Sequence, residues 1–173
     1  MPYTLIPTTL GTCGLAWQGT AVARFSLPGA TDAEAVQRVA QGGKLVLETE
    51  APAWVRALVA RVRRHLAGDL QDFSDVPLEA AHVSAFQHGV YRLTLAIPAG
   101  STRSYGAIAA ALGAGPAGAR AVGVALATNP WPLLVPCHRV VSARGTMTGF
   151  SAPGGIRTKT RLLAIEGAEL ISE

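Results

Sequence analysis

The chain has 173 residues, 49% of them hydrophobic and 15% charged, a composition that excludes an intrinsically disordered chain. This length can bury one ample core or two small ones. The two cysteines, Cys13 and Cys137, exclude a disulfide-stabilised scaffold and predict a free thiol in a reducing compartment.

Neither a signal peptide nor a membrane span is expected. The first ten residues lack a cationic start and an unbroken apolar core. No apolar stretch is long enough and free enough of Gly and Pro to cross a bilayer. We therefore expect a cytoplasmic protein that does not engage membranes.

The net charge of +4 is unevenly distributed along the chain. Residues 1–81 hold seven Lys or Arg against eight Asp or Glu, whereas residues 82–173 hold eight against three. A basic half without a low-complexity run favours a folded surface that meets a polyanion such as nucleic acid, although many basic domains bind nothing anionic.

The first half of the chain predicts an α/β arrangement. Turn glycines separate short β-prone runs over 8–27, which is typical of strands joined by tight turns. Hydrophobic periodicity predicts helices over 31–41 and 51–67, with a strand over 44–48 between them. The acidic, irregular stretch 70–81 predicts a linker.

The end of the second predicted helix carries the basic cluster Arg61-Arg63-Arg64-His65. One reading is a phosphate-binding patch. We interpret it instead as a solvated helix face whose cations lie near the negative end of the helix dipole.

The second half predicts three helices. Ser84 and Gln87 have the spacing of a capping box, followed by apolar residues at helical spacing up to Ile97. Further helices are expected over 105–112 and 119–127, joined by a turn that contains Gly and Pro. This order has the outline of a helix-turn-helix, an outline that many other helix pairs share.

The last of these helices carries a single long polar side chain, Arg120. It has none of the Asn, Gln or Lys residues that read base edges in the major groove, which argues against a sequence-specific regulator. Because Ala121, Gly123 and Ala127 protrude little, the helix suits the minor groove. Small-to-large packing against a neighbouring helix is the alternative.

Cys137 is the first candidate for chemistry. Prolines at 130, 132 and 136 fix φ and remove backbone donors, so the approach to Cys137 is neither a continuous helix nor a central strand. A thiolate held at the end of such an approach, beside His138, can be made reactive by nearby proton acceptors. A buried, unreactive cysteine is the alternative.

The hexapeptide from Pro136 to Val141 resembles the active-site signature of the O6-alkylguanine-DNA alkyltransferases, also called methylated-DNA–protein-cysteine methyltransferases. The resemblance covers roughly residues 83–168. The runs that carry it follow in the family's order: Arg103–Ala109, Gly118–Gly123, Asn129–Val140, Gly149–Gly155 and Leu162–Gly167.

This resemblance implies a fold and an activity. It implies an α/β N-terminal domain, residues 1–81, that is RNase H-like, and a mainly α C-terminal domain, residues 82–173, with a winged-helix-like helix-turn-helix. It also implies direct-reversal DNA repair, in which an alkyl group on O6 of guanine in duplex DNA is transferred irreversibly to Cys137. Use of O4-alkylthymine is left open. The nucleotide is flipped out of the stack, and each molecule acts once, as a monomer without a cofactor.

Individual roles are implied in the same way. His138 and Glu166 match the proton relay of the family, and Asn129 matches the residue that braces the turn presenting the cysteine. Tyr105 matches the tyrosine set against the purine, and Arg120 matches the arginine that fills the vacated space. The remaining implied pocket and DNA contacts are Ala121, Gly123, Val135, Val140, Phe150 and Ser151.

Two positions depart from the common pattern, since Phe150 replaces a tyrosine and Ile165 a histidine found in many relatives. Cys13, His65, His82 and His88 show no ligand spacing, so no metal site is expected.

Two other functions are alternatives to DNA repair. A lesion sensor without repair activity is disfavoured because Cys137 is intact. A cysteine hydrolase acting on a small molecule would use Cys137 and His138, and it would turn over.

Overall fold

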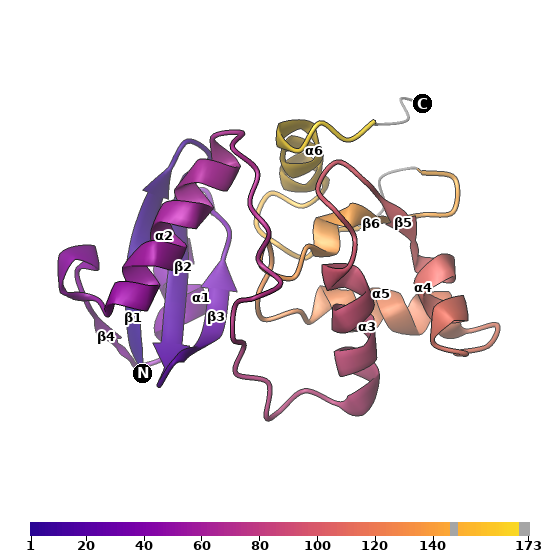
Figure 1. Cartoon of the computed structure of the whole chain (residues 1–173), viewed down its shortest axis with the longest axis horizontal. Coiled ribbons are helices and arrows are strands. Elements are labelled where there is room, and N and C mark those ends of the chain that lie inside the picture. Colours follow the sequence, from indigo (N-terminus) through magenta and orange to yellow (C-terminus); the bar gives the residue numbers. More distant parts are fainter. Residues whose placement is uncertain (146–148, 170–173) are drawn as a thin grey trace.

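The computed structural model describes residues 1–145 and 149–169, which form an α/β side and a helical side (Figure 1). The α/β side contains a four-stranded sheet in the order β3-β2-β1-β4. Strands β1 (Pro2–Thr8), β2 (Gly11–Gln18) and β3 (Ala21–Ser26) are antiparallel neighbours, and β4 (Lys44–Leu45) pairs in parallel with the start of β1.

Two of the expected strand boundaries were wrong. The expected strands began at residue 8 and missed β1, because Pro2 and Pro7 obscure its alternation. Pro7 is tolerated there because β4 pairs only with Pro2 and Tyr3 and leaves the outer edge of β1 open at Pro7. The strand expected over 44–48 is confined to Lys44–Leu45, and the chain then turns into a 3-10 helix, Glu48–Glu50.

Helices α1 (Asp32–Ala40) and α2 (Ala53–Leu66) cover opposite faces of the sheet. Val39 of α1 packs with Tyr3 and Ala16, whereas Val55 and Val59 of α2 belong to the main core with the residues of the other face. Side chains alternate between the two faces along each strand, and each face is buried by the helix that covers it.

The predicted linker contains no helix or strand, but it is packed rather than free. It runs between the sheet side and α3 (Ala85–Leu95) in Figure 1. The N–H of Val22 donates to the carbonyl of Pro77 at 2.8 Å, and the N–H of Glu79 donates to the carbonyl of Val22 at 2.8 Å. Phe73 is buried in the core.

The helical side begins with the predicted capping box. The Ser84 hydroxyl accepts from the Gln87 N–H at 3.2 Å, and the Ser84 N–H donates to Oε1 of Gln87 at 2.9 Å. The remaining elements are α4 (Tyr105–Ala111), α5 (Gly118–Ala127), the 3-10 helix η2 (Cys137–Arg139), α6 (Ile156–Ile165), and the parallel strands β5 (Arg103–Ser104) and β6 (Val140–Val141).

One continuous cluster of buried side chains joins the two sides. Nε1 of Trp131 donates to the carbonyls of Val22 at 3.0 Å and Ala23 at 3.1 Å, and the N–H of Phe25 donates to the carbonyl of Pro130 at 2.9 Å. The division into two domains at residue 81 stays a prediction. Residues 146–148 and 170–173 of the second predicted domain lie outside the described part of the chain.

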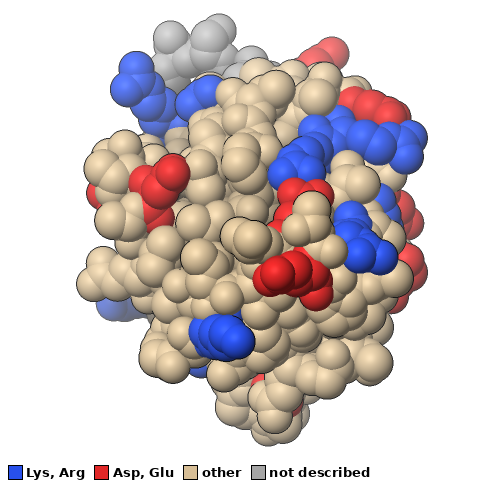
Figure 2. All heavy atoms as spheres, turned by 90° about the vertical axis from the view of Figure 1, so that its left-hand side faces the viewer, with Lys and Arg blue, Asp and Glu red and all other residues tan. Residues whose placement is uncertain are grey.

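Charges on the outer α/β surface are mixed. Figure 2 shows this face, the left of Figure 1, with Lys and Arg interspersed among Asp, Glu and uncharged residues. On α2, three ion pairs join Arg61 to Asp75, Arg63 to Glu48 and Arg64 to Asp69. These arginines belong to a solvated face, as expected. His65 does not, because its side chain is fully buried.

Among the described residues, none of the helices has the length and apolar character that a membrane crossing requires.

Candidate active site around Cys137

Asn129 holds together the irregular segment that leads to Cys137. Its Oδ1 accepts from the N–H of Trp131 at 2.9 Å, and its Nδ2 donates to the carbonyl of Val135 at 3.0 Å. Leu133 adopts a left-handed φ of 79°, which a non-glycine residue rarely does, within the turn closed by the hydrogen bond from the Val135 N–H to the Trp131 carbonyl at 2.8 Å. Cys137 therefore opens η2 from a braced turn.

The thiol lies at the wall of a cavity of about 400 Å³. Cys137 is 6% exposed, so little of it reaches solvent. It also lines a neighbouring cavity of about 460 Å³. The cavity lies between α5 and the segment 149–151. Its lining comprises Tyr105, Gly123, Leu126, Ala127, Cys137, Gly149, Phe150 and Ser151.

Glu166 is buried next to His138, and both of its carboxylate oxygens accept hydrogen bonds. Nε2 of His138 lies 2.9 Å from its Oε1, and Arg139 donates from Nε to Oε2 at 2.9 Å and from Nη2 to Oε1 at 2.8 Å. Burial raises the pKa of the Glu166 carboxyl, but hydrogen bonds from histidine and arginine outweigh it and hold that pKa below the usual range. The carboxylate is ionised.

An ionised carboxylate only accepts hydrogen bonds, which sets the tautomer of His138. Its Nε2 carries the proton, and the lone pair is on Nδ1. Nδ1 of His138 is buried and has no hydrogen-bond partner among the described residues. Burial lowers the pKa of His138 and outweighs the hydrogen bond to Glu166, so the ring is a neutral base near pH 7.

The thiol is not a preformed thiolate. Burial raises the pKa of Cys137 above its usual value, although a hydrogen bond with Asn129 and the charge of Lys159 act in the opposite direction. A buried neutral thiol requires a base to become a nucleophile, and His138 is the adjacent candidate.

Lys159 is buried in the first turns of α6 and contacts Tyr105, which lines the cavity. Its Nζ donates to the carbonyl of Val140 at 2.6 Å and to the hydroxyl of Tyr105 at 3.4 Å. It also lies 5.6 Å from the centre of the Tyr105 ring. Burial lowers the pKa of Lys159 to about 8, against the opposing influence of Cys137.

Of the other predicted residues, two lie on the exposed face of α5 and two are buried close to Cys137 in the sequence. Arg120 and Ala121 are exposed on α5, and Arg120 makes no hydrogen bond or ion pair with a described residue. Val135 and Val140 have buried side chains, and their carbonyls accept from Asn129 and Lys159 respectively.

Sequence reasoning missed three residues of this site: His65, Arg139 and Lys159. Helical spacing contains the signal for two of them. His65 follows Val62 by three positions on the buried stripe of α2, and Lys159 precedes the buried Leu162 and Leu163 by three and four. The assignment of His65 to the solvated basic cluster was wrong, because its ring is fully buried against Phe73.

The sequence predicts no metal site. Over residues 1–145 and 149–169, no three His, Cys, Asp or Glu side chains are grouped so that they could hold a metal ion.

Comparison with known proteins places the chain in a family. The family described as 6-O-methylguanine DNA methyltransferase, DNA binding domain, matches residues 85–168. A methylated-DNA–protein-cysteine methyltransferase of Mycolicibacterium paratuberculosis is 45% identical over 118 residues, which cover 68% of each chain. The protein of that name from Methanothermobacter thermautotrophicus is 35% identical, with 71% of this chain and 67% of the relative covered.

Solved structures agree in fold. The O6-methylguanine methyltransferase of Mycobacterium tuberculosis superposes with a TM-score of 0.76 at 32% identity, covering 99% of this chain and 95% of that one. The M. tuberculosis OGT in complex with DNA gives 0.74 at 34% identity, covering 96% and 93%. The chain belongs to the methylated-DNA–protein-cysteine methyltransferase family.

Proposed function

We propose that this protein repairs DNA by moving an alkyl group from O6 of guanine in a duplex to Cys137, once per molecule. The observation that carries the proposal is the position of the thiol, at the wall of a cavity of about 400 Å³ with a neutral histidine and an ionised carboxylate behind it. Membership of the family and a relative solved in complex with DNA support the choice of substrate.

In the proposed reaction, the proton of the Cys137 thiol passes to Nδ1 of His138, directly or through one bridging water. The charged Glu166 stabilises the imidazolium that forms. The sulfur attacks the saturated carbon attached to O6, so a C–S bond forms as the C–O6 bond breaks. The electron pair of that bond leaves with the guanine.

Tyr105 and Lys159 serve the leaving group. The guanine departs more easily when its ring gains a proton. Tyr105 lines the cavity and its hydroxyl is the proposed donor, and the ammonium of Lys159, 3.4 Å from that oxygen, stabilises the phenolate that forms. The proton that returns to Tyr105 afterwards comes from solvent.

The proposed DNA-binding element is the pair α4 and α5, read as a helix-turn-helix of winged-helix type beside an RNase H-like N-terminal domain. The exposed face of α5 consists of small residues around Arg120, with Val124 61% exposed beside it. Because these side chains protrude little, this face of α5 can approach the minor groove closely. Arg120 can then occupy the space that a flipped nucleotide leaves.

The product is a thioether, which none of the groups around Cys137 can hydrolyse at neutral pH. We therefore propose a stoichiometric transferase that acts as a monomer on alkylated duplex DNA in the cytoplasm. It needs no cofactor, because the thiol itself accepts the group.

Intact-mass measurement after incubation with an O6-methylguanine duplex tests this function. The wild type is expected to gain the mass of one methylene group, and Cys137→Ser is expected to gain nothing. Cys13→Ala is the matched control and should gain the same mass as the wild type, because burial raises the pKa of Cys13 to about 12. An unchanged wild-type mass would refute the proposal, and the same assay with O4-methylthymine tests the second substrate.

A further inference from the structure

His65 connects the α/β side of the molecule to the reaction centre. It lies on α2, 101 positions before Glu166 in the sequence, and both side chains are fully buried. Nε2 of His65 is 2.9 Å from Oε1 of Glu166. His138 is 2.9 Å from the same oxygen.

The tautomer of His65 follows from its second contact. The backbone N–H of Gln71 donates to Nδ1 of His65 at 3.0 Å, so Nδ1 is the acceptor and the ring proton is on Nε2. Nε2 therefore donates to the carboxylate of Glu166. The turn after α2 thus sets which ring nitrogen of His65 faces the active site.

Oε1 of Glu166 receives three donors, from His65, His138 and Arg139, while Oε2 receives one from Arg139. Arg139 donates one hydrogen bond to each carboxylate oxygen, both from the same guanidinium in η2. The donor from α2 approaches from a separate element and fixes the position of the oxygen that His138 also uses.

We propose that His65 is a positioning residue for the methyl transfer, acting through Glu166 on His138. This inference rests on the proposed function and adds to it a contribution from the α/β side. His65 does not touch the cavity that contains Cys137, so its influence on the rate passes through the carboxylate.

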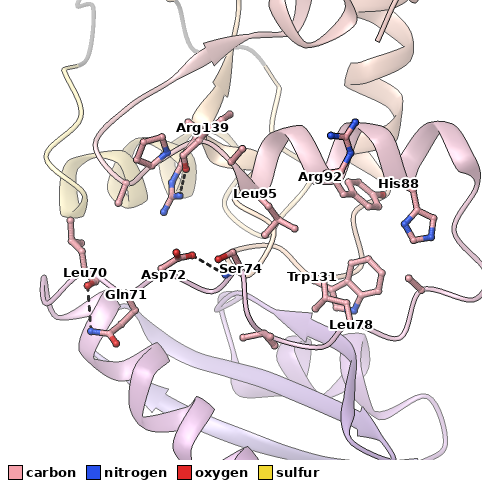
Figure 3. Close-up of a pocket in the computed structure, with 17 residues that line it drawn as sticks. Leu70, Gln71, Asp72, Ser74, Leu78, His88, Arg92, Leu95, Trp131 and Arg139 are labelled. Atoms are coloured by element: carbon pink, nitrogen blue, oxygen red, sulfur yellow. Dashed lines mark hydrogen bonds between the residues drawn. The ribbon is translucent and has the colours of Figure 1, made fainter. Parts of the chain in front are cut away.

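The surroundings make this hydrogen bond important. A second cavity, of about 860 Å³, is lined by Gln71 and Asp72 of the linker and by Arg139. Figure 3 shows Gln71 and Asp72 on the linker side of this cavity, with Arg139 above them. Glu166 and His65 do not line this cavity and their side chains are fully buried, so bulk solvent does not replace a lost donor between them.

A structural role for His65 is the competing explanation. In that case its function is to hold the turn after α2 through the hydrogen bond from Gln71, and the bond to Glu166 is incidental. The two roles use different ring nitrogens, and single substitutions separate them.

The amide nitrogen of glutamine can take the place of Nε2, whereas an asparagine reaches only as far as Nδ1. His65→Gln therefore keeps a donor toward Glu166 and loses the acceptor for Gln71, and His65→Asn does the reverse. Single-turnover transfer from an O6-methylguanine duplex, measured over a range of protein concentrations, separates the maximal rate constant from DNA affinity.

We expect His65→Gln to keep the maximal rate constant within about threefold of the wild type, and His65→Asn to lower it by about tenfold or more with unchanged DNA affinity. Any unfolded fraction lowers the amplitude of transfer and leaves the rate constant of the folded molecules, so poor folding does not imitate the effect.

Equal rate constants for the two variants, or a loss confined to His65→Gln, would overturn the positioning role and leave the proposed function intact. A wild type that accepts no methyl group would overturn the proposed function and the positioning role together.

Discussion

Arg139 donates two hydrogen bonds to Glu166, from Nε to Oε2 at 2.9 Å and from Nη2 to Oε1 at 2.8 Å. Its third nitrogen, Nη1, donates to the carbonyl of Ile97 at 2.6 Å. Both charged side chains are buried, so each depends on the other for stability in the core.

Arg139→Met should lower the free energy of unfolding by about 3–5 kcal/mol, because it leaves the carboxylate of Glu166 buried without its main partner. Urea denaturation measures the change. Arg64→Met is the matched control, since the Arg64–Asp69 pair is exposed and should change stability by less than about 1 kcal/mol. Equal, small losses in the two variants would contradict the importance of the buried pair.

His138→Gln should slow methyl transfer by about 10²–10⁴-fold, because the amide can still donate to Glu166 but cannot take the proton of Cys137. Single-turnover kinetics measure the rate, and anisotropy of a labelled duplex checks that DNA affinity is unchanged. In this variant the rate should rise steadily with pH, as the thiol begins to ionise without a base. A rate close to that of the wild type would show that His138 is not the base.

The wild-type rate should depend on pH with two limbs. It should fall on the acid side below the ordinary histidine pKa of 6.5, because burial lowers the pKa of His138 and only the neutral ring accepts a proton. It should fall again on the alkaline side near pH 8, where Lys159, with a pKa of about 8, loses its charge.

Lys159→Met checks the alkaline limb. The variant should be slower at pH 7 and should lose the decline near pH 8. A wild-type rate that keeps rising above pH 8 would indicate that ionisation of the thiol alone controls the reaction.

Arg120→Ala should slow transfer from duplex DNA by about 10–100-fold, since the cost of unstacking a nucleotide is a few kcal/mol and each 1.4 kcal/mol corresponds to a factor of ten. Transfer from the free base O6-methylguanine should stay within about twofold. Arg157→Ala, an exposed arginine on α6, is the control and should leave both rates unchanged. Equal losses on duplex and free base would contradict a role for Arg120 in flipping.

Much of this site could be predicted from local sequence, and the exceptions have physical causes. The proline-rich approach to Cys137 and the capping box at Ser84 are local features, and both are found in the structure. The contact between His65 and Glu166 joins positions 101 residues apart, and no local pattern shows which buried faces meet.

For His65 and Lys159 the residue type suggests a place at the surface, but the position on the helix puts both side chains in the core. A histidine next to two arginines looks like part of a basic surface, yet its phase with Val62 on α2 places it in the core. Lys159 is similar, because its position three residues before the buried Leu162 places it in the core, where the Val140 carbonyl accepts a hydrogen bond from its ammonium.

The most direct test of the central claim is a titration of the protein with excess duplex DNA that carries a labelled methyl group on O6 of guanine, followed by peptide mapping. The account predicts a plateau at one methyl group per protein molecule, with all of the label in the peptide that contains Cys137. Product that keeps accumulating beyond one equivalent, or label on any other residue, would contradict it.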